Sequence, residues 1–227
     1  MPPRKIKGII FDLDGTLIDS YQAIYLSFRH VYESMGLRPL SYEEVKREIG
    51  LGLTRTFGDL LGEDRVAQAL RLFDEKYQQV MDHHTFLLPD ARQVLEELHR
   101  LGVKMAIATN KIGRYSRRIM KNFGLDGIFS AILGDEDVSR NKPHPEMVFL
   151  AIGKMEIRKE EVVMVGDSLV DLETARNAGV AAFAIPTGVT PREDLEKACP
   201  TRMLSRLTDL LPIVRSSTLG GPHPISI

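Results

Sequence analysis

The sequence lacks several features that would place the protein outside the cytoplasm. It has one cysteine among 227 residues, so no internal disulfide can form, and a reducing, cytoplasmic setting is expected. No apolar run approaches the roughly 20 residues that a membrane-spanning helix needs. The basic N-terminal stretch leads into an apolar run that ends at Asp12, which is too short for a signal peptide. These absences disfavour a secreted or a membrane protein.

An excess of one charge is also missing. Lys plus Arg number 30 and Asp plus Glu number 31, whereas nucleic-acid-binding domains usually carry a clear basic excess. We therefore expect no nucleic-acid partner. Apolar residues make up 43% of the chain, which is enough for a sizeable core, and we find no internal repeat.

Short apolar stretches alternate with helical patterns over most of the chain. Strands are expected at 7–11, 103–108, 131–133, 162–165 and 180–185, because these stretches are short and apolar. Helices are expected at 89–101, 115–123, 145–154, 169–178 and 204–214. Strands that alternate with helices predict a doubly wound parallel sheet with helices on both faces, which is a Rossmann-like α/β core.

The stretch after the first strand has a different pattern. It reads as helical throughout, and Ser41 and Glu44 form a capping-box signature at the start of one of its helices. We therefore expect a small helical cap at 19–86, inserted into a core formed by 1–18 and 87–215. Residues 216–227 are rich in Gly, Pro and Ser, which is typical of a poorly ordered tail.

Polar residues gather at or beyond the carboxyl ends of the expected strands, where open parallel sheets bind ligands. Neighbouring carboxylates repel each other, so a group of them needs a cation or a shared proton. Their hard oxygen atoms suit Mg²⁺, and a lysine and a hydroxyl complete the groups that phosphoryl transfer requires. The residues are Asp12, Asp14, Thr109, Asn110, Lys142, Asp167 and Asp171.

Four motifs at these positions resemble those of the haloacid dehalogenase superfamily. They read FDLDGT, ATN, KPHPE and VGDSLVD, in that order, and the resemblance covers about residues 6–214. It implies a Mg²⁺-dependent phosphatase that acts on a small phosphorylated metabolite through an aspartyl-phosphate intermediate. In this resemblance Asp12 is the nucleophile and a metal ligand. Asp14 is the general acid/base and binds the metal through its backbone carbonyl.

The resemblance also assigns the other motif residues. Thr109 and Asn110 match the phosphate-binding motif. Lys142 matches the lysine that steadies the nucleophile and the phosphate. Asp167 matches a direct metal ligand, and Asp171 matches either a ligand or a residue that orients one. Ser168 and Asp171 together also form a good helix cap.

The cap stretch is similar to the phosphoglycolate phosphatase subgroup. The segments LSYEEV at 40–45 and IGLG at 49–52 carry this similarity, and 2-phosphoglycolate is the substrate that it implies. A closed cap would place the turn Gly50, Leu51 and Gly52 nearest the core. Arg47 or Arg55 could then pair with a substrate carboxylate, although both arginines, like Tyr21, are more often solvated helix residues.

Several alternatives stay open. Pyrophosphatases and sugar phosphatases of the same superfamily have similar caps, and a sugar phosphomutase of that superfamily is a further alternative. By resemblance, Asp14 argues against a dehalogenase and Thr16 argues against a phosphomutase. A non-enzymatic phosphate-sensing module would be expected to lack the nucleophile or the acid, and both are present here. The sequence is compatible with a monomer or a homodimer.

Overall fold

The computed structural model describes residue 3 and residues 5–218. Of the tail expected at 216–227, residues 219–227 lie outside the described part. Residues 216–218 instead form the end of helix α10 (Leu210–Thr218). The hydroxyls of Ser216 and Ser217 donate to the carbonyls of Ile213 and Val214 at 3.0 and 2.8 Å. The helix therefore continues beyond its last apolar residue.

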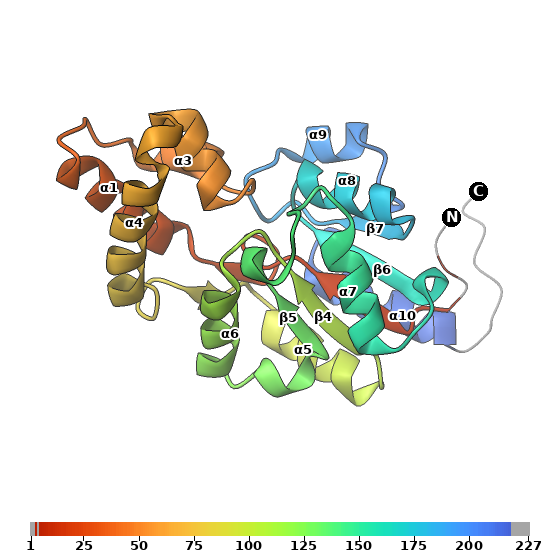
Figure 1. The fold of residues 1–227 in the computed structure, drawn as a ribbon. Coiled ribbons are helices and arrows are strands. Elements are labelled where there is room, and N and C mark those ends of the chain that lie inside the picture. The colour runs from red at the N-terminus through yellow and green to blue at the C-terminus, as the bar shows by residue number, and fades with distance from the viewer. Residues whose placement is uncertain (1–2, 4, 219–227) are drawn as a thin grey trace.

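Six parallel strands form the central sheet, in the order β5-β4-β1-β6-β7-β8 (Figure 1). They are β1 (Gly8–Phe11), β4 (Lys104–Ala108), β5 (Ala131–Leu133), β6 (Val162–Gly166), β7 (Ala181–Ala184) and β8 (Arg202–Met203). In chain order, β4 and β5 are added on one side of β1, and β6, β7 and β8 are then added on the other side. The order of the strands therefore reverses at β1, which is where such sheets open a ligand crevice.

Alternate residues of the central strand enter two different hydrophobic clusters. Ile9 and Phe11 pack in the cluster that includes helices α5 (Ala91–Arg100), α6 (Gly113–Asn122) and α10. Ile10 belongs to the cluster on the other face, with α7 (Glu146–Met155) and α8 (Leu169–Ala178). A strand that is buried on both faces reads as a continuous apolar run. The predicted doubly wound α/β fold is confirmed.

Residues 19–86, called the cap below, lie between β1 and β4 in the sequence and gather beside the sheet (Figure 1). Their helices are α1 (Tyr21–Ser34), α2 (Tyr42–Arg47), α3 (Leu53–Leu61) and α4 (Val66–Val80). Three buried rings hold α1, α3 and α4 together, since Phe28, Phe57 and Phe73 have centroid separations of 4.8 to 6.1 Å. The capping box predicted for Ser41 and Glu44 is present.

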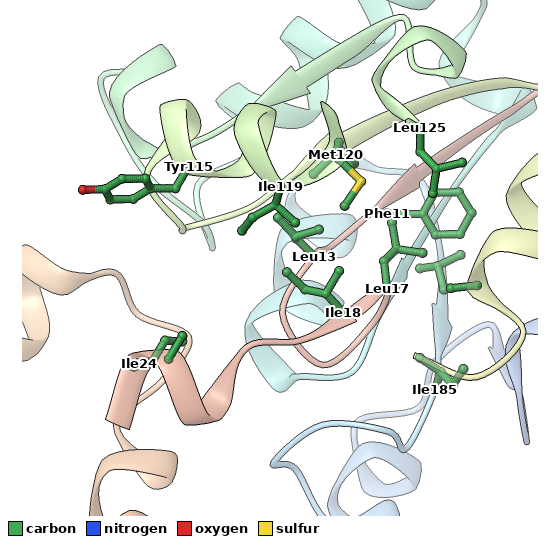
Figure 2. Close-up of a cluster of buried hydrophobic side chains, with 14 of the residues drawn as sticks. Phe11, Leu13, Leu17, Ile18, Ile24, Tyr115, Ile119, Met120, Leu125 and Ile185 are labelled. Atoms are coloured by element: carbon green, nitrogen blue, oxygen red, sulfur yellow. The ribbon is translucent and has the colours of Figure 1, made fainter. Parts of the chain in front are cut away.

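A two-stranded antiparallel ribbon that the sequence did not predict joins the cap to the core. It pairs β2 (Ile18–Asp19) with β3 (Phe86–Leu87). Two-residue strands are too short for an alternating pattern to show in the sequence. Leu13, Leu17 and Ile18 carry the buried cluster from β1 toward this ribbon and α1 (Figure 2). The two segments that connect the core to the cap, one entering the cap and one leaving it, are therefore hydrogen-bonded to each other in this ribbon.

The C-terminal part differs from the predicted helix at 204–214. Leu204 N donates to Ala184 O at 2.8 Å, so the residue extends the sheet beyond β8. The side chain of Asp209 accepts a hydrogen bond from Ser205 N at 2.7 Å, and a 3₁₀ turn at Leu207–Asp209 precedes α10. The short helix α9 (Arg192–Lys197) was also missed. Within the described residues, no helix has the length and apolarity needed to cross a membrane.

Candidate active site

The loop after β1 presents two carboxylates at the carboxyl edge of the sheet. Asp12 N still donates to Val165 O at 2.9 Å, and Gly15 then turns the chain with a φ of 86°. A Cβ atom at Gly15 would lie 2.5 Å from Tyr21 Oη and 2.6 Å from Asp167 Oδ2. Glycine is therefore needed both for the backbone conformation and for the close approach of these side chains.

Lys142 lies between two carboxylates beneath this loop. Its ammonium is 2.6 Å from Asp12 Oδ1 and 2.7 Å from Asp171 Oδ1. Its side chain is only 3% exposed. Burial alone would lower the pKa of Lys142, but the two carboxylates outweigh it and raise the pKa above its ordinary value. Lys142 therefore carries a fixed positive charge against the side chain of Asp12.

Three buried carboxylates form the acidic end of the site. Asp12, Asp167 and Asp171 each offer an oxygen atom, and these atoms lie within 4.8 Å of one another. In the absence of a cation, burial raises the pKa of Asp12 to about 7 even though Lys142 lowers it. Burial, and then the charges of Asp12 and Asp171, raise the pKa of Asp167 well above its ordinary value. Such a set of hard oxygen atoms fits a divalent cation, which would supply the missing positive charge.

Both carboxylate oxygens of Asp171 accept hydrogen bonds. Oδ1 accepts from Lys142, and Oδ2 accepts from the backbone and the hydroxyl of Ser168 at 3.1 and 2.6 Å. Ser168 Oγ in turn accepts from Asp171 N at 3.3 Å, which completes a capping box on α8. The expected helix cap is therefore present, and the same carboxylate orients Lys142.

Thr109 and Asn110 follow β4 and differ in their hydrogen bonds. The Asn110 side chain accepts from Lys142 N at 2.9 Å and donates to Lys142 O at 3.0 Å. It also donates to Gly50 O of the cap at 2.8 Å. Asn110 is thus occupied in joining three segments. The Thr109 hydroxyl accepts from Lys111 N at 3.2 Å and can still donate to a ligand, because Thr109 lines the pocket described below.

Lys111 is a site residue that the sequence reasoning missed. Its ammonium lies 3.1 and 3.0 Å from the two carboxylate oxygens of Asp14 and 3.2 Å from Ser20 Oγ. Burial would lower the pKa of Lys111, but the charge of Asp14 outweighs it and raises the pKa above its ordinary value. The position directly after the Thr109-Asn110 motif was the available signal. The partner, Asp14, is 97 positions away, and only the fold reveals it.

A pocket lies between these core residues and the cap. Its core side includes Asp12, Asp14, Thr109, Lys142 and Asp167. Its cap side is mostly aliphatic and aromatic, so the space next to the charged groups has few polar partners to offer. The cap residues that line it are Tyr21, Ile24, Phe28, Glu48, Ile49, Gly50, Gly52, Leu53, Thr56, Phe73 and Tyr77.

The cap residues proposed for substrate specificity are only partly brought to this pocket. Gly50 and Gly52 line it, whereas Leu51, Arg47 and Arg55 are absent from its lining. Arg47 is exposed, and Arg55 lies 3.7 Å from Asp59 on the outside of the cap, with its side chain 63% exposed. The pairing of either arginine with a substrate carboxylate stays a prediction, and this conformation of the cap does not support it.

Two tyrosines of the cap were not expected to matter. Tyr21 is 6% exposed rather than solvated, and it lines the pocket. Burial, and then the charges of Asp167, Asp14 and Asp12, raise its pKa. Tyr77 is 1% exposed and lines the pocket from α4. A lone tyrosine on a helix is most often core material, so no local pattern distinguishes these two.

Comparison with known families and curated proteins gives one consistent result. The sequence profile of the haloacid dehalogenase-like hydrolases matches residues 9–185. A phosphoglycolate phosphatase of Vibrio parahaemolyticus is 32% identical over 227 residues, which cover 96% of this chain and all of the relative. A candidate pyrophosphatase, PpaX, of Caldanaerobacter subterraneus subsp. tengcongensis is 34% identical over 211 residues, covering 93% of this chain and 96% of the relative.

Solved structures agree with the sequence relatives. A candidate haloacid dehalogenase-like hydrolase from Bacteroides fragilis superposes with a TM-score of 0.86 at 32% sequence identity. The alignment covers 91% of this chain and all of that one. Both the core and the cap therefore have counterparts in a solved protein of similar length.

Proposed function

Since the chain belongs to the haloacid dehalogenase-like hydrolases and is a phosphoric monoester hydrolase, we propose that it is a Mg²⁺-dependent phosphatase with an aspartyl-phosphate intermediate. The observation that carries this proposal is the contact of Lys142 with Asp12 and Asp171, at 2.6 and 2.7 Å, on the floor of a pocket. This contact orients a buried carboxylate beside a fixed positive charge, in a pocket that the Thr109 hydroxyl also lines.

In the first step Asp12 attacks the phosphorus atom. The new bond joins a carboxylate oxygen of Asp12 to phosphorus, and the bond from phosphorus to the leaving oxygen breaks. Lys142 holds Asp12 in place, and its ammonium and the Thr109 hydroxyl offset charge on the phosphoryl oxygens. Asp12, Asp167 and the backbone carbonyl of Asp14 would hold Mg²⁺, which would supply Lewis-acid stabilisation of the same oxygens.

Asp14 handles the protons in both steps. It gives a proton to the leaving oxygen, and it then takes a proton from the water that attacks the phosphorus of the acyl phosphate. This second attack restores the Asp12 carboxylate and releases inorganic phosphate. Asp14 lines the pocket beside Asp12, and this position supports the role.

The substrate that we propose is 2-phosphoglycolate, in a cytoplasmic setting. The relative of that name in Vibrio parahaemolyticus supports it, and so does the contact between the cap turn and the core. Gly50 O accepts from Asn110 Nδ2, so the cap turn rests on the core directly above Lys142. We expect a cap in this position to leave space for a small leaving group and to exclude a phosphorylated protein side chain.

Pyrophosphate is a second candidate substrate. The similarity to PpaX supports it, and the buried ammonium of Lys111 beside the pocket provides a positive charge for a leaving phosphate. Sugar phosphates have less support, because the mostly apolar cap side of the pocket offers few groups that could bind sugar hydroxyls.

The test combines a substrate panel with trapping of the intermediate. We expect kcat/KM to be highest for 2-phosphoglycolate or pyrophosphate among small phosphorylated compounds. Acid quenching during turnover of a ³²P-labelled substrate should leave label on the peptide that contains Asp12, and hydroxylamine should remove it. A fully active enzyme that never acquires this label would contradict the covalent mechanism.

We further propose that residues 19–86 form a cap that opens and closes on a core made of 1–18 and 87–215. The β2–β3 ribbon, which joins both passages of the chain, supports a hinge there. Hydrogen exchange measured with and without a phosphate analogue should show protection of α3 and α4 on binding, while β1 and β6 change little.

A further inference from the structure

Tyr77 carries a buried hydroxyl group without a partner. The residue is 1% exposed and projects from α4. Its Oη atom faces Lys111 and Ser20, but no described residue forms a hydrogen bond of ordinary geometry with it. Leaving a buried hydroxyl unpaired is unfavourable, so native structures rarely keep one without a reason. Since Tyr77 lines the pocket, a ligand in the pocket could provide the missing acceptor.

A positive charge lies at the same place. Lys111 approaches from the core, with its ammonium 4.9 Å from the centroid of the Tyr77 ring. The ammonium also contacts Asp14, the residue proposed to protonate the leaving oxygen. Tyr77 and Lys111 therefore lie beside the position of the leaving group, and not beside the phosphoryl oxygens that Lys142 and Thr109 serve.

The other hydroxyl groups nearby are already engaged or face elsewhere. Thr56 Oγ1 donates to Glu48 O at 3.2 Å, and the Tyr115 hydroxyl donates to Asp74. Tyr21 Oη lies at the acidic end, near Asp167. The remaining cap walls around Tyr77, such as Phe28 and Phe73, cannot form ordinary hydrogen bonds. Around the leaving-group position, Tyr77 thus offers the uncommitted donor from the cap.

We propose that Tyr77 is a specificity-determining residue whose hydroxyl donates a hydrogen bond to an anionic oxygen of the leaving group, beside the ammonium of Lys111. This inference rests on the proposed phosphatase function and narrows its substrate class. The leaving group carries a carboxylate or a second phosphate close to the bridging oxygen. An anionic acceptor forms a stronger hydrogen bond than a neutral one, and Lys111 offsets the charge that the leaving group brings into an otherwise apolar space.

The decisive variant is Tyr77→Phe, which removes one oxygen atom and keeps the ring. Three substrates are compared by kcat/KM in the full-length, Mg²⁺-supplied enzyme: 2-phosphoglycolate, pyrophosphate and ethyl phosphate. Loss of a hydrogen bond to a charged group should lower kcat/KM roughly 10- to 100-fold for at least one of the two anionic substrates. Ethyl phosphate, which lacks the acceptor, should change by less than about threefold on the same reasoning.

A matched control and a stability measurement separate this role from a structural one. Tyr32→Phe changes another buried cap tyrosine, at 6% exposure, that does not line the pocket, and it should leave the substrate preference intact. Because the Tyr77 hydroxyl is unpaired in the free protein, Tyr77→Phe should keep or raise the thermal unfolding temperature. A merely structural hydroxyl would lower that temperature and would reduce kcat/KM for all three substrates alike.

The outcomes identify the ligand and keep the two proposals apart. A loss confined to phosphoglycolate identifies the carboxylate as the acceptor, and a loss confined to pyrophosphate identifies the leaving phosphate. Equal loss on all three substrates, or loss of the preference in Arg47→Ala or Arg55→Ala but not in Tyr77→Phe, overturns the role of Tyr77. If ethyl phosphate is as good a substrate as the anionic pair, the leaving-group inference fails while the phosphatase function stands. If the wild-type enzyme hydrolyses none of the three, the proposed function itself fails.

Discussion

The core side and the cap side of the pocket differ in polarity. On the core side Asp12, Asp14, Lys111 and Lys142 are charged, buried or nearly so, and bound to one another by ion pairs of 2.6 to 3.1 Å. On the cap side aromatic rings such as those of Phe28 and Phe73 pack on each other. The chemistry therefore belongs to the core, which must keep its charges fixed. We expect the cap to select and enclose the leaving group.

The largest effect should come from the core. Asp12→Asn keeps the shape of the side chain but removes the nucleophile and one metal ligand, so kcat should fall at least about 1000-fold. Steady-state kinetics on 2-phosphoglycolate and circular dichroism of the folded protein measure the two properties separately. A variant that retained a tenth of the wild-type kcat would exclude Asp12 as the nucleophile.

Lys142→Met should damage both activity and stability. The carboxylates of Asp12 and Asp171 would lose their shared cation, and breaking such a buried pair costs about 3–5 kcal/mol. Chemical denaturation measures that loss, and kcat should fall roughly 100-fold or more because the phosphoryl oxygens lose a stabilising charge. Lys154→Met, on the exposed side of α7, is the matched control and should behave like the wild type.

Removal of the divalent cation should make the stability of the protein depend on pH. Burial raises the pKa of Asp12 from 3.8 to about 7, so between these values the folded state binds more protons than the unfolded state. The stability of the metal-free protein should therefore fall as the pH rises toward 7 and stay low above it. Mg²⁺ competes with those protons, so its stabilising effect should be larger at pH 8 than at pH 5.

Thermal unfolding with and without Mg²⁺ at the two pH values checks this expectation. Equal stabilisation at pH 5 and pH 8 would show that the acidic end does not hold the ion. In the same preparations, chelation should abolish turnover and Mg²⁺ should restore it. Ca²⁺ should inhibit, because its looser coordination would misplace Asp12.

The smallest effect is expected at the contact between cap and core. Asp74 on α4 accepts hydrogen bonds from Tyr115 and Arg114 on α6. Asp74→Ala should raise KM by up to about fivefold, since partly exposed ion pairs contribute little, and high salt should mimic part of the change in the wild type. Asp59→Ala, which removes an ion pair within the cap, should leave KM unchanged. A similar rise in both variants would point to general loosening of the cap.

Local patterns were enough to predict most of the fold and the motif residues of the core. The runs at β1, β4 and β6 are short and apolar because both faces of each strand are buried. The acids that follow β1 and β6 stand out against them. The same local logic failed for β2 and β3, whose two residues each show no period, and at 204–214, where Asp209 delays the helix.

What the sequence by itself determined was the set of elements and the chemistry at their ends, since both depend on neighbours within a few residues. The tertiary structure decided which distant groups meet. It pairs Lys111 with Asp14, places Tyr77 in the pocket with its hydroxyl unpaired, and leaves Arg55 on the outside with Asp59. The local sequence around an arginine near a glycine turn is the same whether its side chain faces the pocket or the solvent. Its direction depends on how the cap helices pack, and that packing depends on contacts between residues far apart in the chain.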